Sequence, residues 1–168
     1  MFWYKVAAVN KKGQHVFAPA GIPIAECVYV GCALTYAPQA FKDAVEHLKE
    51  ETRRAHIPVL DFVGLTAGTD LDVYETDLSY ARGARLFVAI CDELSIGLGM
   101  EIQARFEVGR PMLLIAQDFL KVTRMVSGGA RKHSTTTIMR TYTRLREEGP
   151  ILVRDAMGYF KLPHPVWS

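Results

Sequence analysis

From Cys27 onward the sequence alternates short hydrophobic runs with longer segments that have helical periodicity. The runs are hydrophobic over most or all of their length, with no regular polar alternation, at residues 28–30, 58–63, 86–90 and 112–116. Strands of this kind are buried on both faces, as in a parallel sheet that helices cover on both sides. The pattern therefore predicts a three-layer α/β/α domain.

The segments between these runs predict the covering helices. Phe41, Ala44, Val45 and Leu48 follow one another at helical spacing, which predicts a helix ending near Arg54. Further helices are expected at residues 72–83, 97–108 and 134–148, and a fifth strand at 151–153. The expected fold is a doubly wound, flavodoxin-like parallel sheet of about five strands.

The first 26 residues do not follow this alternation. Phe2–Val9 is a β-prone run, Asn10–Gly13 predicts a turn, and Gln14–Phe17 could return as a second strand. We expect residues 1–26 to form an appendage of hairpin and linker, followed by one domain over residues 27–168.

Composition excludes several classes of function. The 168 residues include 20 basic and 18 acidic side chains, so nothing requires a nucleic-acid or membrane partner. No apolar stretch approaches the roughly 20 residues of a membrane helix. The three cysteines have no metal-ligand spacing, and Walker A, GxGxxG and GxSxG motifs are absent. We expect a cytoplasmic protein with no metal and no cofactor, acting on a small molecule.

The loop after residues 86–90 carries the most information, because ligands of such folds bind at the carboxyl ends of the strands. Gly97 and Gly99 let the backbone turn tightly and a ligand approach closely. Glu101 is expected in the first turn of a helix, where the helix dipole would lower its pKa and keep it ionised. An ionised glutamate there suits a nucleophile or a cation stabiliser, although it could also simply cap its helix.

The segment Ser95–Ile102 (SIGLGMEI), followed by Gly-Arg-Pro at 109–111, resembles the signature of the nucleoside 2-deoxyribosyltransferase family. The resemblance implies that Glu101 is the nucleophile that attacks the anomeric carbon of a deoxyribose. It also implies that Asp77, 24 residues earlier, handles the base, and that Tyr29 in the first strand lies near the nucleophile. Two carboxyl groups in different environments can divide charge stabilisation and proton donation between them.

Two positions bear on the substrate that the resemblance implies. Ser95 stands where nucleoside-using transferases carry an aspartate and the related deoxynucleoside 5'-monophosphate N-glycosidases carry a serine that contacts phosphate. Thr123, or else Ser127, matches the polar residue that a neighbouring subunit contributes. Neutral hydroxyls tolerate a phosphate, but residues 32–36 lack the serine and arginine that grip phosphate in the nucleotide branch. Nucleoside and 5'-monophosphate, and transfer and hydrolysis, all remain open.

Other residues after the strands complete the expected substrate site: Gly31, Cys32 and Asp92. The resemblance implies a homodimer or larger homo-oligomer with shared active sites. Such an interface would cover a group of apolar residues after the fourth strand: Phe119, Leu120, Val122, Met125 and Val126. These residues could instead cover their own sheet. The alternatives to an enzyme are a non-catalytic nucleotide-sensing module and a plain flavodoxin-like domain.

Overall fold

A computed structural model describes residues 21–61, 69–93 and 95–163. Five strands form one parallel sheet in the order β2-β1-β3-β4-β5. They are β1 (Val28–Cys32), β2 (Val59–Leu60), β3 (Leu86–Ile90), β4 (Met112–Ala116) and β5 (Thr137–Thr141). This order confirms the doubly wound, flavodoxin-like sheet, in which β1 and β3 flank the point where the winding reverses.

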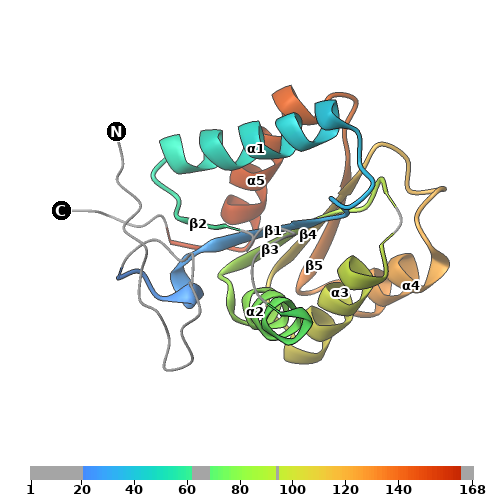
Figure 1. Cartoon of the computed structure of the whole chain (residues 1–168), viewed down its shortest axis with the longest axis horizontal. Helices are drawn as coiled ribbons and strands as arrows, with labels where there is room; N and C mark the ends of the chain where they lie inside the picture. The colour runs from blue at the N-terminus through green and yellow to red at the C-terminus, as the bar shows by residue number, and fades with distance from the viewer. Residues whose placement is uncertain (1–20, 62–68, 94, 164–168) are drawn as a thin grey trace.

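Helices cover both faces of the sheet, as the hydrophobic runs predicted. One face carries α1 (Gln39–Arg54) and α5 (Leu145–Tyr159), and the other carries α2 (Asp70–Gly83), α3 (Ile96–Val108) and α4 (Arg124–Lys132) (Figure 1). Alternate strand residues enter two separate cores, because successive side chains of a strand point to opposite faces. Tyr29 belongs to the core under α2 and α3, and Val30 to the core under α1 and α5.

The C-terminal third differs from the prediction. The helix expected at residues 134–148 and the strand expected at 151–153 are wrong, since β5 and α5 occupy this region. Pro150 does not end α5, because Val153, Ala156 and Met157 are fully buried on one face of that helix. Packing thus outweighs the hydrogen bond that a proline removes from a helix. Three consecutive threonines lead into β5, and their β-branched side chains favour a strand.

Element boundaries shift by a few residues elsewhere. α2 starts two residues earlier than expected because Thr69 and Asp72 form a reciprocal capping box. β2 is shorter than the strand predicted at residues 58–63; residues 62 and 63 of that prediction lie outside the described ranges. A helix, α4, lies in the segment that was expected to be a loop.

The described residues before β1 pack on the domain. Ile22 and Ile24 contact the core under α2 and α3, and a short 3-10 helix, η1 (Ile24–Glu26), leads into β1. The hairpin expected within residues 2–17 lies outside the described residues. Across the described ranges, no helix is both long enough and apolar enough to span a bilayer.

Candidate active site

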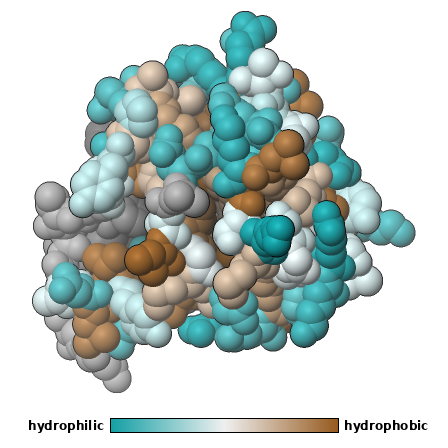
Figure 2. Space-filling view, turned by 90° about the vertical axis from the view of Figure 1, so that its right-hand side faces the viewer, coloured by the Kyte–Doolittle hydropathy of each residue, from teal (hydrophilic) through white to brown (hydrophobic). Residues whose placement is uncertain are grey.

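The carboxyl ends of the strands bring together residues that are far apart in sequence. The hydroxyl of Tyr29, on β1, donates a hydrogen bond of 3.0 Å to Oε1 of Glu101, on α3, and both groups are buried. Figure 2 looks onto this end of the molecule, where patches of hydrophobic side chains lie among polar ones. The pairing of Tyr29 with Glu101, expected from the resemblance, is therefore present in the fold.

Gly31 makes room for the Glu101 carboxyl group. A Cβ atom on Gly31 would lie 2.5 Å from Oε2 of Glu101 and 2.7 Å from the ring of Phe87, closer than any side chain allows. The carboxyl group therefore lies directly against the backbone of β1, where only a glycine fits. The sequence singled out Gly31 as a substrate contact, and the structure adds that it seats the carboxyl group.

The protonation of Glu101 differs from the expectation. Glu101 is the sixth residue of α3, beyond the first turn, and its side chain is buried, with 7% exposure for the residue. Burial raises its pKa to about 8, the charge of Asp77 raises it further, and the hydrogen bond from Tyr29 lowers it. The prediction of a lowered pKa is wrong, because desolvation outweighs the helix dipole at this depth.

Asp77, on α2, is the second acid of the site. It is half-buried, and its Oδ1 atom is shielded from solvent without a hydrogen-bond partner. Burial raises the pKa of Asp77 to about 6. Burying a hydrogen-bond acceptor without a donor costs free energy. A ligand that donates a hydrogen bond to Oδ1 of Asp77 would remove this cost and bind more tightly.

Aromatic rings hold Tyr29 in place. Its ring stacks on Phe87 at 5.4 Å and meets Tyr80 edge-on at 5.5 Å. Burial, followed by the charge of Glu101, raises the pKa of Tyr29 well above its usual value, so its hydroxyl stays a neutral donor. Sequence reasoning missed Tyr80 and Phe87. Neither residue belongs to a motif or to a loop after a strand, and only the fold brings their rings against Tyr29. The hydroxyl of Tyr80 is buried without a hydrogen-bond partner.

The start of α3 leaves space near the site. Ser95 is half-buried and caps the helix, its Oγ accepting a hydrogen bond of 3.2 Å from the backbone N–H of Leu98. A Cβ atom on Gly97 would meet nothing closer than 3.7 Å, and one on Gly99 nothing within 4 Å. These two glycines are thus not required by packing within the described structure, which is compatible with a ligand approaching there.

Cys32 and Asp92, two further residues expected at the substrate site, make their contacts with other parts of the fold. Cys32 packs against the core under α1 and α5, and burial raises the pKa of its thiol to about 12. Asp92 accepts hydrogen bonds from the backbone N–H of Gln117, at 2.6 Å, and from the hydroxyl of Tyr142. Its carboxylate thereby ties together the ends of β3, β4 and β5. Their roles as substrate contacts remain predictions.

Thr123 and Ser127 belong to α4 and its N-terminal cap, away from the Tyr29–Glu101 pair. Thr123 is exposed and caps α4, its Oγ1 accepting from the N–H of Met125 at 3.4 Å, while Ser127 is half-buried within α4. No contact between either residue and Glu101 is found within the described part of this chain. Thr123 instead lines a groove of about 510 Å³ between α2, α3 and α4, together with Ile96, Met100 and Met125.

Within the described ranges, no group of three or more His, Cys, Asp and Glu side chains is arranged to hold a metal ion. The groups brought near one another are instead the buried carboxyl group of Glu101, the half-buried carboxyl group of Asp77 and the Tyr29 hydroxyl. Such a set can stabilise a positively charged carbon and exchange protons without a metal.

The domain is a three-layer α/β/α protein of flavodoxin-like topology with an acidic pair at the carboxyl ends of its strands. It is similar to the Clostridium botulinum CMP N-glycosidase BcmB, with a TM-score of 0.55 and 16% identity, over 77% of this chain and 98% of that chain. It is also similar to the solution structure of BlsM, with a TM-score of 0.62 and 16% identity, over 85% and 98%. At 16% identity, these likenesses confirm the expected fold. Neither the protein-family models nor the curated proteins gave a match.

Proposed function

We propose that the protein is an enzyme that cleaves or transfers the N-glycosidic bond of a (deoxy)nucleoside or of its 5'-monophosphate. The observation that carries the proposal is the buried Glu101, held by the Tyr29 hydroxyl, with the unpartnered Oδ1 of Asp77 on the neighbouring helix. The likeness in fold to a CMP N-glycosidase supports the same class of reaction.

In this proposal Glu101 attacks the anomeric carbon while the bond from that carbon to the base breaks. The departing base keeps the bonding electron pair and takes a proton from Asp77. The ester bond between Glu101 and the sugar is then broken by water in a hydrolysis, or by a second base in a transfer. Gly31 and Tyr29 keep the carboxyl group of Glu101 in one orientation for both steps.

The proton distribution changes during this reaction. In the free protein Glu101, with a pKa of about 8, holds a proton more tightly than Asp77, with a pKa of about 6. Attack requires the ionised form of Glu101 and a protonated Asp77. A base that stacks over the half-buried Asp77 would desolvate it further and raise its pKa, which moves the proton to where the reaction needs it.

Hydrolysis is the second form of the proposal, and the description of BcmB as a CMP N-glycosidase favours it. The neutral Ser95 at the start of α3 is compatible with a phosphorylated substrate, since an aspartate there would repel phosphate. A nucleotide-sensing module on the same fold would bind the same ligands without turnover.

The shared active site is part of the proposal. Of the five apolar residues expected at the interface, Phe119 and Val126 pack on the protein's own core, and Val122 is buried within it. Leu120 and Met125, in contrast, are 94% and 85% exposed.

Two further exposed residues, Ile96 and Met100, line the groove beside Thr123. An apolar surface of this kind suits a two-fold contact between copies of the chain. In such a dimer Thr123 of one subunit would approach the site of the other. The dimer thereby gives the exposed apolar side chains of α3 and α4 a partner.

A substrate panel tests the proposed activity. Deoxynucleosides and their 5'-monophosphates are incubated with the protein, with and without an acceptor base, and free and exchanged bases are separated by chromatography. We expect released or exchanged base from the wild type and a loss of at least ~10³-fold in Glu101→Ala. Glu75→Ala, which removes an exposed glutamate from α2, is the matched control. Binding without turnover would favour the sensing module and contradict the enzyme.

Subunit exchange tests the shared site. Glu101→Ala protein is mixed with an inactive Thr123 variant under conditions in which exchange is verified independently. About a quarter of the sites should recover activity, since half of the dimers are mixed and each contains one intact site. No recovery after verified exchange, or a monomer at assay concentration, would contradict sharing and leave the catalytic proposal standing.

A further inference from the structure

Arg105 is a buried cation whose guanidinium donates hydrogen bonds to a cluster of backbone carbonyl groups. It is 0% exposed and belongs to α3. Its Nη1 donates to the carbonyl oxygens of Ala81 at 2.9 Å, Arg82 at 3.1 Å and Ala84 at 2.9 Å. Its Nη2 donates to Arg85 at 3.2 Å and Pro111 at 2.6 Å, and its Nε to Pro111 at 3.2 Å.

These carbonyl groups explain why a cation can be buried there. Ala81 and Arg82 belong to the last turn of α2, whose carbonyl groups lack partners within the helix and carry the negative end of its dipole. The planar guanidinium has five N–H donors and can bind several such oxygens at once. Burial lowers the pKa of Arg105 to about 9, which still leaves it cationic at neutral pH.

The position of this contact relates it to the two acids. Ala81 follows Asp77 by four residues on α2, and Arg105 follows Glu101 by four residues on α3. Four residues are about one helical turn, so each contact residue lies on the same helical face as the acid, about 6 Å along the axis. Both helices follow strands of one parallel sheet, and both run from its carboxyl end toward its amino end. The Arg105 contact thus joins α2 and α3 one turn beyond the pair Asp77–Glu101.

A second polar contact between α2 and α3 is weak. Arg82 and Glu107 approach to 4.0 Å, and both side chains are about half-exposed, so solvent screens their attraction. The Arg105 contact is buried and multiply bonded, and it is therefore the tie that can hold the spacing of the two helices.

We infer that Arg105 is a positioning residue that sets the separation between Asp77 and Glu101. The inference about the acids' separation stands on the contact itself, and its catalytic consequence rests on the proposed function. Loosening the contact lets α2 move relative to α3. The charge of Asp77 then acts less strongly on Glu101, and the proton donor is misplaced relative to the nucleophile.

The test compares Arg105→Met and Arg105→Lys with Arg110→Met. Arg110 lies beyond the end of α3 and donates one hydrogen bond of 2.7 Å to the carbonyl of Gly83, at the same end of α2. Arg110→Met therefore removes a contact to α2 without releasing α3. Lysine at position 105 keeps the charge but loses the planar set of donors.

The first measurement is independent of any activity. The carboxyl groups of Asp77 and Glu101 are titrated by NMR in protein labelled with ¹³C-aspartate and ¹³C-glutamate. The neighbouring tyrosines, Tyr29 and Tyr80, are the same in all variants. In Arg105→Met we expect the midpoint of Glu101 to fall and its dependence on the titration of Asp77 to weaken, with Arg105→Lys intermediate. Arg110→Met should titrate like the wild type.

The second measurement uses the substrate that the wild type turns over. We expect kcat to fall ~10²-fold in Arg105→Met, with KM changed far less, because the acids are displaced while the remaining substrate contacts are not. Arg105 has only a structural role, and the inference is overturned, if Arg105→Met and Arg110→Met have the same titration midpoints for both acids and the same kcat. If Arg105→Met does not fold, Arg105→Lys carries the same comparison. A wild type without activity would contradict the proposed function, and the titration would still decide the role of Arg105.

Discussion

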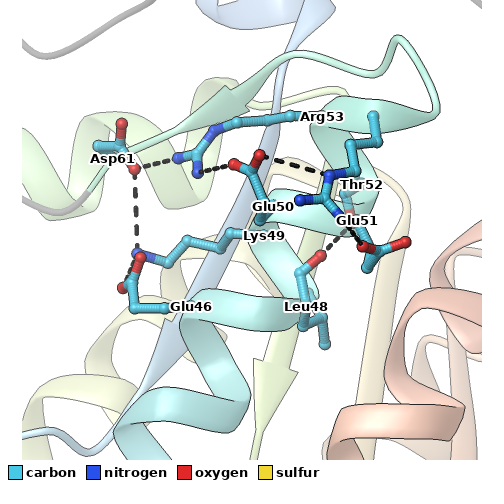
Figure 3. Close-up of polar contacts among 9 residues, drawn as sticks. Glu46, Leu48, Lys49, Glu50, Glu51, Thr52, Arg53 and Asp61 are labelled. Carbon is cyan, nitrogen blue, oxygen red and sulfur yellow. Dashed lines mark hydrogen bonds and ion pairs between the residues drawn. The ribbon is translucent and has the colours of Figure 1, made fainter. Parts of the chain in front are cut away.

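The carboxyl groups on the two faces of the sheet have opposite surroundings. Under α1, the ammonium of Lys49 is almost fully buried but lies 2.5 Å from Glu46 and 3.9 Å from Asp61. Arg53 also binds Asp61, so that both cations converge on one carboxylate (Figure 3). Under α2 and α3, by contrast, Glu101 and Asp77 are two acids whose pKa values are raised, mainly by burial, and no nearby cation among the described residues contributes to either shift.

Under the proposed function, this difference marks the face under α2 and α3 as the one that performs the chemistry. A buried cation beside carboxylates has its charge compensated and contributes to holding α1 on the sheet. Two acids without a compensating cation keep protons near neutral pH, which costs stability in the free protein but suits proton transfer. We therefore expect substitutions on the acidic face to change catalysis, and substitutions on the face under α1 to change mainly stability.

Removing the proton donor on the acidic face should have the largest effect. Asp77→Asn keeps the shape of the side chain but has no transferable proton, so we expect a rate loss of ~10²–10⁴-fold. The loss should be greater for substrates with poor leaving bases, which depend most on protonation. Rates measured for a series of bases check this, with Glu75→Gln as the control on the same helix. An equal loss across the series would indicate a structural role for Asp77.

Displacing the nucleophile without changing its chemistry should come next. Gly31→Ala places a methyl group 2.5 Å from Oε2 of Glu101, closer than a normal contact, so the carboxyl group must move. We expect kcat to fall ~10²-fold and the free energy of unfolding to fall by about 1–3 kcal/mol. Gly158→Ala is the control, because a Cβ atom there meets nothing within 4 Å. Wild-type kcat in Gly31→Ala would show that the position of the Glu101 carboxyl group is not critical.

The acidic face should also make stability depend on pH. The folded-state pKa of Glu101, about 8, lies above its unfolded value, so the folded protein binds more protons than the unfolded chain between about pH 4 and pH 8. Stability contributed by this group is present below the unfolded pKa and is lost as the pH rises through the folded pKa.

Glu101→Gln should remove this dependence. We expect it to raise the free energy of unfolding at pH 8 by on the order of 3 kcal/mol relative to the wild type, and by less at pH 5. Denaturant unfolding at the two pH values measures the difference. A pH-independent effect of the substitution would contradict the raised pKa.

The paired face should give the smallest effect on activity. Lys49→Met removes one of the two cations on Asp61 and leaves Arg53 in place, so we expect a loss of stability of about 1–3 kcal/mol. Turnover, measured below the unfolding transition, should stay within twofold of the wild type. A large change in turnover with unchanged stability would mean that the charges under α1 take part in catalysis.

Much of the fold could be predicted from local hydrophobic patterns. The wholly apolar runs that became β1, β3 and β4 required burial on both faces, and a parallel sheet with helices on both sides provides it. The pattern failed where local preference and packing disagreed. Gly149 and Pro150 are typical helix breakers, yet α5 continues through them because its buried face packs on the core with α1.

Only part of the candidate site could be predicted from the sequence. The resemblance to the nucleoside 2-deoxyribosyltransferase family implied Tyr29, Asp77 and Glu101 as site residues, and the structure brings Tyr29 and Glu101 into hydrogen-bond contact. Their protonation could not be predicted, because a pKa depends on how much solvent the fold removes and on which charges it brings near. The helix-dipole argument for Glu101 used only its place in the sequence and therefore had the wrong sign.

The sequence by itself determined that the chain forms a layered α/β domain and which residues are candidates for its chemistry, because hydrophobic period and residue type are local properties. Only the tertiary structure decided that Gly31 seats the Glu101 carboxyl group, and that Arg105, in the last turn of α3, is buried on carbonyl groups at the end of α2. An arginine within a helix ordinarily lies on its solvated face. Its burial here depends on partners more than 20 residues away, which no local pattern contains.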